Sequence, residues 1–374
     1  MHILFAGGGT AGHINPALAA AGYIRARHPE AKISFIGTQN GLEARLVPEA
    51  GYDFYTIDVA GFQRKINFTN IKRNISALGK VFKASFDAKK MLFALKPDVV
   101  VGTGGYVSGP VLRQAAKLGI KTAIHEQNAF PGITTKMLAP MVDKVMLAMP
   151  DAQKHLKLKS EPIITGNPVR ESLLNMSREQ ARRKLGMDSR PFILSFGGSL
   201  GARPINQAVA DLIKWHFKTG KYYHYHATGK TGYEPTMQLL KDNGVEVEGL
   251  SNIRITEYIN DMDVLMAAAD LVICRCGAIT LSELQVQGKP SILIPSPYVA
   301  ENHQFHNAMT MKRINAAEVI EEKDLTGYRL IRTVALLLSD KARLLQMGQN
   351  AKKLAVFDAN QRIYNVIMQL CEQA

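Results

Sequence analysis

The chain of 374 residues is 46% hydrophobic and carries a formal net charge of +14. This charge predicts an anionic membrane or a phosphorylated substrate as partner. Nucleic acid is not expected, because no nucleic-acid-binding module or aromatic-basic stacking motif is visible. Its length predicts two domains of about 150 to 200 residues, each with its own core. No apolar run reaches the ~18 residues that a membrane-spanning helix needs, and a strand pattern rather than a signal sequence opens the chain, so we expect a soluble, cytoplasmic protein.

A buried strand is predicted at residues 1–6, followed by the glycine-rich turn Gly7 to His13 and a helix from about Pro16 to Arg27. A second strand at 32–36 completes a βαβ unit. Backbone N–H groups at such a turn favour an anionic ligand. A tight strand-to-helix turn that binds nothing fits the same residues.

Residues 70–95 predict one or two helices in which apolar residues recur every three or four positions and are interleaved with cations. The apolar residues are Ile71, Ile75, Leu78, Phe82 and Phe86, and the cations are Lys72, Arg73, Lys80, Lys83, Lys89 and Lys90. Core packing is the more frequent explanation for such an apolar stripe. The excess of cations keeps a role at a membrane surface open.

Two further strands are predicted to end in glycine-rich or polar segments. The strand at 98–101 leads into the turn 102–110 and a helix, and the strand at 121–124 ends in His125, Glu126, Gln127 and Asn128. Ligands bind at the carboxyl ends of strands in open α/β sheets, so these residues are candidates for a site. Taken singly, His125 is expected to be a structural histidine rather than a catalyst.

The alternation of strands and helices breaks at 166–170, and we interpret the charged segment 177–184 that follows as the connection between two domains. A strand at 191–196 then enters a second glycine-rich turn at 197–203. The arrangement at the N-terminus is therefore repeated in the second half of the chain.

Strands near 222–228 and 253–255 are predicted to extend the second sheet. The last two predicted helices, 340–354 and 361–373, are candidates to pack back across the first domain. Each half of the chain is thus predicted to be an α/β sheet with a glycine turn.

Asp261 and Asp263 form a pair of a kind that can hold a divalent metal. They stand at the start of a predicted helix with Asn260 or Asp261 as its N-cap, and carboxylates there stabilise a helix without any metal, so we prefer the capping interpretation. No other carboxylate or histidine cluster predicts a tight metal site. The cysteines are too few and wrongly spaced for a disulfide framework or a four-ligand zinc site, which agrees with a reducing compartment: Cys274, Cys276 and Cys371.

The stretch 271–295 predicts a buried strand, a small-residue turn, a helix over 279–287 and another buried strand. The turn and the helix N-terminus favour a diphosphate, and Glu283 is placed to accept hydrogen bonds from both hydroxyls of a ribose. We therefore predict a nucleotide diphosphate at this turn. The alternative is that Gly277 and Ala278 only allow close packing of helix on sheet and that Glu283 is solvated.

Seven segments stand out in combination: GGGTAGH, GTGGYVSGP, HEQN, GNPVR, GGSLGAR, EYINDM and CRCGAITLSE. Together they resemble, nearly end to end, the MurG family, the UDP-N-acetylglucosamine transferases that complete the lipid-linked peptidoglycan precursor. The resemblance implies an α/β chain of two Rossmann-like domains with parallel sheets and an interdomain cleft, the glycosyltransferase B fold. It implies an acceptor-binding, membrane-facing domain at 1–166, with a C-terminal helix at 358–374 packed back onto it, and a donor-binding domain at 167–357.

For the donor, UDP-N-acetylglucosamine, the resemblance implies contacts mainly on the second domain. They are Arg170 and the backbone of Ile259 at the uracil, Glu283 at the ribose, Ser199 and Thr280 at the diphosphate, and Ala278, Ile279, Asn128, Gln304, Thr10, Ala11 and Gly12 around the donor. Helix N-termini and hydroxyl donors also stabilise the charge that grows on departing UDP. No metal or other cofactor is therefore expected.

The acceptor implied by the resemblance is a polyprenyl-diphosphate-linked muramyl peptide on the first domain. Its contacts would be Gly9, Gly104, Gly105, Tyr106 and Ser108. Inverting transfer needs a base that takes the proton of the acceptor's 4-hydroxyl. His13 is the first candidate for this base, and Glu126 and His125 are its rivals.

The acceptor's lipid tail stays in the bilayer, so the resemblance implies a peripheral protein on the cytoplasmic face of the cell membrane, which is anionic. Its apolar patch with a cationic rim would be Ile75, Leu78, Phe82 and Phe86 with Lys80 and Lys83. The resemblance is also compatible with other cell-wall synthesis proteins as partners.

Three positions depart from the family's usual pattern: Ala11 stands where a glycine is frequent, Cys276 where many relatives have serine, and His303 where a second glutamine is common. Other functions remain as alternatives. They are transfer from another nucleotide sugar, sugar-nucleotide epimerisation on a similar two-domain fold, and non-catalytic nucleotide-sugar binding or scaffolding.

Overall fold

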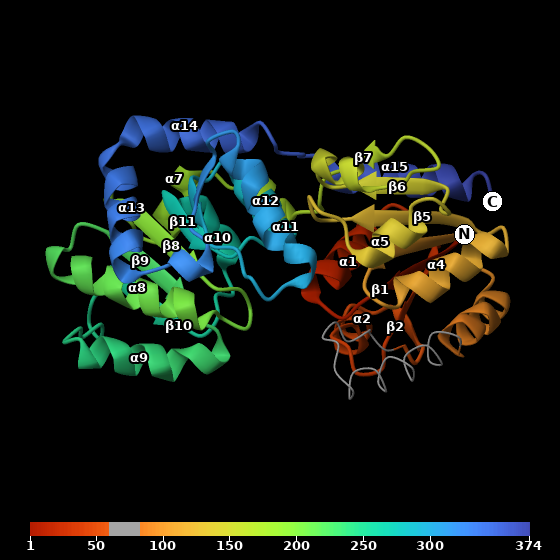
Figure 1. Cartoon of the computed structure of the whole chain (residues 1–374), viewed down its shortest axis with the longest axis horizontal. Helices are drawn as coiled ribbons and strands as arrows, with labels where there is room; N and C mark the ends of the chain where they lie inside the picture. Colours follow the sequence, from red (N-terminus) through yellow and green to blue (C-terminus); the bar gives the residue numbers. More distant parts are fainter. Residues whose placement is uncertain (60–82) are drawn as a thin grey trace. The chain divides into compact units, whose positions relative to one another are not determined.

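The computed structural model describes residues 1–59 and 83–374. Two compact units make up this part of the chain: the first comprises Met1–Pro168 and Asp358–Ala374, and the second comprises Val169–Phe357. Each unit is built on one parallel sheet (Figure 1). The predicted fold class, α/β with two Rossmann-like domains, is confirmed.

The first unit contains a seven-stranded parallel sheet in the order β3-β2-β1-β4-β5-β6-β7. Its strands are β1 (His2–Gly7), β2 (Lys32–Gly37), β3 (Asp53–Thr56), β4 (Val99–Gly104), β5 (Lys121–Glu126), β6 (Lys144–Leu147) and β7 (Ile163–Ile164). Alternate residues of β1 enter two different cores: Ile3 and Phe5 join one, and Leu4 and Ala6 join the other. Strands that are buried on both faces need continuous apolar runs, which explains the pattern in the sequence.

Helices cover both faces of this sheet. Ile14 of α1 packs with Ile367 of α15 on one face, and Ala88 packs with Leu112 of α4 on the other. The helices are α1 (Ala11–Arg25), α2 (Glu43–Glu49), a helix at 83–95, α4 (Ser108–Lys117), α5 (Ile133–Leu138), the 3-10 helix η1 (Pro150–His155) and α15 (Ala359–Cys371). α1 begins at Ala11, before its predicted start at Pro16, so Pro16 lies inside the helix.

The last helix of the chain returns to the first unit. α15 lies against α1 and against strands β4 and β5, with Val366 and Ile367 in the core (Figure 1). α14 (Lys341–Lys352), which we expected to pack across the first domain as well, packs on α11 and α13 of the second unit instead. Its Met347 is buried in that unit's core. The expectation for residues 340–354 is therefore wrong.

The second unit contains a six-stranded parallel sheet in the order β10-β9-β8-β11-β12-β13. Its strands are β8 (Phe192–Phe196), β9 (Tyr223–Ala227), β10 (Ile253–Thr256), β11 (Leu271–Cys274), β12 (Ser291–Leu293) and β13 (Ala317–Val319). The helices that join or cover them are α6 (Glu171–Asn175), α7 (Arg178–Lys184), α8 (Arg203–His216), α9 (Tyr233–Asp242), α10 (Met262–Ala268), α11 (Ala278–Gln287), α12 (His303–Lys312), α13 (Gly327–Ser339) and α14, with 3-10 helices η2 (Phe217–Thr219), η3 (Lys230–Gly232), η4 (Ala300–Asn302) and η5 (Glu322–Asp324).

The charged segment that we interpreted as a connection between domains is the helix α7 of the second unit. Ser177 and Gln180 close its N-terminus with a capping box. Arg178 and Arg182 both pair with Asp270, at N–O distances of 2.8 and 2.9 Å. This pairing fixes α7 against α10, so the segment belongs to the folded body of the unit and the two units meet in sequence at 168/169.

Three buried histidines of the second unit form a chain of hydrogen bonds. His216 at the end of α8 lies 3.0 Å from His224 of β9, and Ser195 of β8 lies 2.8 Å from both His224 and His226. His226 continues the chain to Asn206 of α8 at 3.2 Å. Burial lowers the pKa of His216 and of His226 to about 4, and it lowers the pKa of His224 well below its usual range.

We expect the free energy of unfolding of the second unit to fall as the pH drops from about 6.5 to about 4, because the unfolded chain takes up protons at these histidines while the folded unit does not. The loss amounts to roughly 3 kcal/mol for a histidine whose pKa is lowered to about 4. Trp215 is the one tryptophan of the chain and lies beside His216, so its fluorescence reports urea unfolding of this unit at each pH.

His216→Gln keeps a hydrogen-bonding group beside His224 and should flatten the dependence of stability on pH. His155→Gln, at an exposed histidine of the first unit, is the matched control and should leave the dependence unchanged. An equally steep pH dependence in the His216 variant would contradict the assignment.

Candidate functional site

The glycine turns after β1 and β4 touch each other in the first unit. A side chain on Gly105, which has a φ of +82°, would overlap the carbonyl oxygen of Gly8. A Cβ on Gly104, whose φ is +101°, would lie 2.8 Å from the His13 ring. Glycine is therefore required at both positions, because only glycine combines this backbone conformation with so close an approach.

His13 stands in the first turn of α1 with its ring over Gly104. Its Nδ1 lies 3.1 Å from the carbonyl oxygen of Gly8 and 3.3 Å from Oγ1 of Thr10. A carbonyl oxygen only accepts, so Nδ1 carries a proton in this arrangement, and the tautomer of the neutral ring that fits this contact has its lone pair on Nε2. No group in the described part of the chain is hydrogen-bonded to Nε2. The geometry thus selects the tautomer whose Nε2 lone pair a general base would use.

Glu43 at the start of α2 supports the first glycine turn. Its side chain is fully buried, and its oxygens accept hydrogen bonds from the backbone N–H of Gly9 (2.9 Å) and from both N–H and Oγ1 of Thr38 (2.9 and 2.7 Å). Burial favours the neutral acid, but these hydrogen bonds hold the pKa of Glu43 below its usual range. Our sequence interpretation missed Glu43; the available signal was an acidic residue at a helix start just after a strand end.

His125 is a buried structural residue. Its Nε2 donates to the carbonyl oxygen of Gly166 at 3.0 Å, and its Nδ1 accepts from the Gln127 amide at 3.1 Å. Burial lowers its pKa and favours the neutral ring. Both ring nitrogens are occupied, which agrees with the structural role expected for His125.

Both carboxylate oxygens of Glu126 also accept hydrogen bonds from the protein. One carboxylate oxygen accepts hydrogen bonds from N–H and Nδ2 of Asn128 (3.0 and 3.1 Å). The other accepts from the N–H of Gly132 (3.1 Å) and from Oγ1 of Thr135 (2.6 Å). With four donors and 3% exposure, this carboxylate organises the loop before α5, and a substrate proton would have to displace one of them.

The residues predicted to bind the acceptor differ in their access to solvent. Gly9 is exposed and Tyr106 is 57% exposed, so both can meet a ligand. Ser108 is fully buried: its hydroxyl oxygen lies 2.7 Å from the carbonyl oxygen of Ala6 and 2.8 Å from that of Gly104, which share its one donor proton, and it accepts from the N–H of Gly104 (3.1 Å). In this structure the hydroxyl of Ser108 holds the turn against β1, and an acceptor contact for Ser108 stays a prediction.

In the second unit, Arg170 and Glu283 form an ion pair across 113 positions of sequence, with Nη2 and Oε1 3.0 Å apart. Burial raises the pKa of Glu283, and the guanidinium of Arg170 opposes this rise. The Glu283 side chain is 12% exposed, whereas Arg170 is 48% exposed. The pair presents a positive group at the surface and a carboxylate beneath it.

Gln304 joins two loops beside the N-terminus of α11. Its Oε1 accepts hydrogen bonds from the N–H of Ser296 (2.9 Å) and the N–H of Cys276 (3.4 Å). Cys276 is fully buried, and burial raises the pKa of its thiol, so it acts as a small filler. His303, where the family pattern differs, has Nδ1 2.8 Å from the carbonyl oxygen of Ala300.

The predicted donor-binding residues fall into two groups. Thr10, Ala11 and Gly12, all exposed at the start of α1, and half-buried Asn128 belong to the first unit. The second unit holds the others: Arg170 just before α6, exposed Ser199 after β8, buried Ile259 after β10, Ala278 with half-buried Ile279 and Thr280 and with Glu283 in α11, and Gln304 in α12.

The paired aspartates stand at a helix start, as the capping interpretation requires. Asp261 is the N-cap residue of α10, but its side chain makes no capping hydrogen bond. Asp263 accepts a hydrogen bond from the N–H of Val264 at 3.0 Å, and a hydrogen bond from the Ser172 side chain is the main cause that lowers its pKa. Within residues 1–59 and 83–374, no group of three or more His, Cys, Asp or Glu side chains is arranged to hold a metal ion.

The helix at 83–95 has one buried and one exposed face. Ala84, Ala88 and Leu92 are buried, whereas Phe86 and Phe93 are 70% and 59% exposed. Exposed lysines flank these two rings: Lys83, Lys89 and Lys90. The other predicted membrane residues, Ile75, Leu78, Lys80 and Phe82, lie outside the described residues. No helix of the described chain is both long and apolar enough to span a bilayer.

Both halves of the chain match domains of one glycosyltransferase family. Residues 3–147 match the glycosyltransferase family 28 N-terminal domain, and residues 192–363 match the glycosyltransferase family 28 C-terminal domain. The first match lies in the first unit and includes both turns that surround His13, whereas the second lies in the second unit except for residues 358–363, which belong to the first.

Two relatives that match this chain over nearly their whole length share one name. A protein of Acetivibrio thermocellus is 48% identical over 98% of this chain and 97% of its own length, and one of Ruminiclostridium cellulolyticum is 44% identical over 99% and 100%. Both are called UDP-N-acetylglucosamine–N-acetylmuramyl-(pentapeptide) pyrophosphoryl-undecaprenol N-acetylglucosamine transferase. Among solved structures, MurG of Acinetobacter baumannii aligns with a TM-score of 0.79 at 29% identity, covering 98% of this chain and 99% of that one.

Proposed function

The chain belongs to glycosyltransferase family 28 and, within it, to the MurG family, and from this membership we propose that it is an inverting N-acetylglucosamine transferase of peptidoglycan biosynthesis. The donor is UDP-N-acetylglucosamine, and the acceptor is the 4-hydroxyl of undecaprenyl-diphospho-N-acetylmuramyl peptide. The observation that carries the proposal is 48% identity over 98% of the chain with a relative named for this reaction.

The second unit supplies the donor site in this proposal. Arg170 and the backbone of Ile259 meet the uracil, and Glu283 accepts from the ribose hydroxyls. The first turn of α11 and the hydroxyls of Ser199 and Thr280 face the diphosphate, where N–H and O–H donors stabilise the charge on departing UDP. The 3.0 Å contact between Arg170 and Glu283 supports a shared site for these two residues.

The first unit supplies the acceptor site and the base. The oxygen of the 4-hydroxyl attacks the anomeric carbon from the face opposite UDP, its proton passes to Nε2 of His13, and the bond to the UDP oxygen breaks with its electron pair. The hydrogen bond from Nδ1 to Gly8 supports this role, because it fixes the tautomer and stabilises the imidazolium that forms. His125 and Glu126 have their polar atoms engaged inside the protein, which favours His13 over them.

The exposed face of the helix at 83–95 supports a peripheral position on the cytoplasmic face of the membrane. Phe86 and Phe93 project from it with lysines on either side, and Lys89 lies 5.8 Å from the Phe93 ring. Aromatic side chains enter the interface of a bilayer while lysines bind anionic lipid head groups. This surface keeps the enzyme at the bilayer that holds its acceptor.

One assay separates the proposed reaction from the alternatives. Purified protein is incubated with UDP-N-acetylglucosamine in the presence and absence of the lipid-linked muramyl peptide. Transfer to the lipid supports the proposal, 2-epimer formation without the lipid indicates an epimerase, and binding without any product indicates a non-catalytic protein. Replacing the donor by UDP-glucose tests the choice of sugar.

Glu283→Ala should reduce donor kcat/KM by roughly ten- to more than a hundredfold, since the lost hydrogen bond to a charged group contributes about 1.5 to 3 kcal/mol. A donor without its 2′-hydroxyl provides the control. The wild type should lose activity with this donor, whereas Glu283→Ala should discriminate far less between the two donors. Equal discrimination in wild type and variant would remove Glu283 from the ribose site.

His13→Ala should lower kcat by about 10² to 10⁴ while UDP affinity stays nearly unchanged, because a general base contributes in the transition state and not to donor binding. Steady-state kinetics and UDP titration measure both quantities. A loss that is confined to acceptor KM would identify His13 as a positioning group.

Phe86→Ser and Phe93→Ser together should weaken co-sedimentation with anionic vesicles and leave the thermal melting temperature nearly unchanged, because both rings are already exposed to water. Tyr328→Ser, at an exposed aromatic residue of the second unit, is the matched control. Undiminished vesicle binding by the double variant would exclude this helix from the membrane contact.

A further inference from the structure

Glu43 and His13 contact opposite ends of one peptide group in the turn after β1. The N–H of Gly9 donates to Oε2 of Glu43 at 2.9 Å, and the carbonyl oxygen of Gly8 accepts from Nδ1 of His13 at 3.1 Å. This N–H and this carbonyl belong to the same planar trans peptide bond, so they point in opposite directions. A single amide therefore connects the carboxylate to the imidazole.

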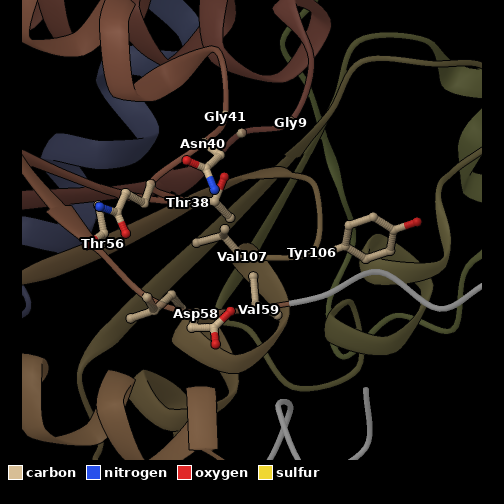
Figure 2. Close-up of a pocket in the computed structure, with 12 residues that line it drawn as sticks. Gly9, Thr38, Asn40, Gly41, Thr56, Asp58, Val59, Tyr106 and Val107 are labelled. Atoms are coloured by element: carbon tan, nitrogen blue, oxygen red, sulfur yellow. The ribbon is translucent and has the colours of Figure 1, made fainter. Parts of the chain in front are cut away.

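The carboxylate of Glu43 lies behind the wall of a cavity of about 520 Å³ (Figure 2). Gly9, Thr38 and Gly41 line this cavity, and Figure 2 shows them together on one side of it. Glu43 itself is fully buried and accepts hydrogen bonds from the backbone N–H of both Gly9 and Thr38. A side chain on Gly41 would overlap its carboxylate. Glu43 thus influences a substrate only through the turn that it holds.

The surroundings of Glu43 favour its charged form. Burial favours the neutral acid, but hydrogen bonds from Gly9 and Thr38 hold the pKa of Glu43 below its usual range. A hydrogen bond to an ionised acceptor is roughly twice as strong as a neutral one, and it polarises the amide that donates it. The carbonyl oxygen of Gly8 is therefore a stronger acceptor than that of an ordinary peptide group.

This polarised carbonyl selects between two arrangements of the His13 ring. Nδ1 also lies 3.3 Å from Oγ1 of Thr10, and a hydroxyl is able either to donate to Nδ1 or to accept from it. The carbonyl oxygen of Gly8 only accepts, so it favours the tautomer with the proton on Nδ1 and the lone pair on Nε2. When Nε2 takes up a proton, the same carbonyl faces an imidazolium, and the carboxylate beyond the amide offsets part of its charge.

We propose that Glu43 is a positioning residue for the transfer reaction and acts on His13 through the peptide group between Gly8 and Gly9. In a Ser-His-Asp triad the carboxylate contacts the imidazole directly, whereas here an amide stands between them. The inference rests on the proposed function, because it takes the role of His13 as the base from it. Glu43 selects the tautomer of His13 and stabilises the imidazolium, in addition to supporting the turn.

The tautomer of His13 is measured first, without substrate. In protein labelled with ¹⁵N in its histidine rings, at about pH 8 where histidine is neutral, the ring resonances distinguish a protonated nitrogen from one with a lone pair. His13→Gln identifies the resonances of His13. The wild type should carry the proton on Nδ1, whereas Glu43→Gln, which keeps the shape but not the charge, should shift the population toward the tautomer protonated on Nε2.

Transfer from UDP-N-acetylglucosamine to the lipid-linked muramyl peptide is measured next. Glu43→Gln should lower kcat about 10- to 100-fold, the range found when outer partners that orient the histidines of metal sites are removed. The KM values for donor and acceptor should change by less than about 3-fold, because Glu43 acts on the base and not on binding.

Asp143→Asn is the matched control. Asp143 accepts hydrogen bonds from N–H and Oγ1 of Thr122, both at 2.9 Å, in the pattern that Glu43 forms with Thr38. Thr122 stands at the start of β5, away from the carboxyl ends of the strands, where His13 lies. Asp143→Asn should therefore lower the thermal melting temperature and leave kcat unchanged.

A wild-type His13 protonated mainly on Nε2 would overturn the proposal, whether or not Glu43→Gln folds. An unchanged tautomer or an unchanged kcat in Glu43→Gln would overturn it as well, and so would a loss confined to the KM of either substrate. Equal losses of kcat in Glu43→Gln and Asp143→Asn would reduce Glu43 to a structural residue. Absence of transfer by the wild type is a separate result, which refutes the proposed function, whereas the tautomer measurement still judges the link between Glu43 and His13.

Discussion

The close approach of two backbone turns is the constraint on which the candidate site of the first unit depends. β1 and β4 are neighbours in a parallel sheet, so their carboxyl ends meet at one edge. Gly105 lies so near the carbonyl oxygen of Gly8 that neither turn tolerates a side chain there. This packing orients the Gly8 carbonyl oxygen toward Nδ1 of His13 and leaves Nε2 for an incoming hydroxyl. The chemistry proposed for His13 is therefore a consequence of backbone geometry.

The second unit uses a related arrangement at its own glycine turn. A side chain on Gly201 would overlap the carbonyl oxygen of Thr228, so the turns after β8 and β9 are also in contact. Asn206 donates to that carbonyl oxygen at 3.0 Å and is itself bonded to His226. The buried histidine chain thus ends beneath the turn to which the proposed diphosphate contact Ser199 belongs. Glycine provides the close approach, and a buried polar network fixes it.

Polar residues of the first unit divide into those that build the site and those that can act in it. Glu43, Ser108, His125 and Glu126 are buried, and their hydrogen bonds are made to the protein itself. Breaking these bonds to reach a substrate would leave donors unpaired in the interior, which is costly. His13 differs because one of its nitrogens is not used in this way. Sequence proximity to a strand end does not separate the two classes, whereas burial and hydrogen-bond partners do.

The sequence by itself determined the α/β class, most strands, the glycine turns and the family, because apolar runs, glycine-rich turns and motif combinations are local in the chain. The predictions for α14 and for the charged segment at α7 were wrong. An amphipathic or charged pattern indicates that a helix packs against another element, but it does not indicate which element. Glu43 went unnoticed for the same reason: its partners Gly9 and Thr38 come from other elements. Only the tertiary structure decided that Ser108 and Glu126 face inward and that Arg170 meets Glu283, because these contacts join residues that the sequence alone does not bring together.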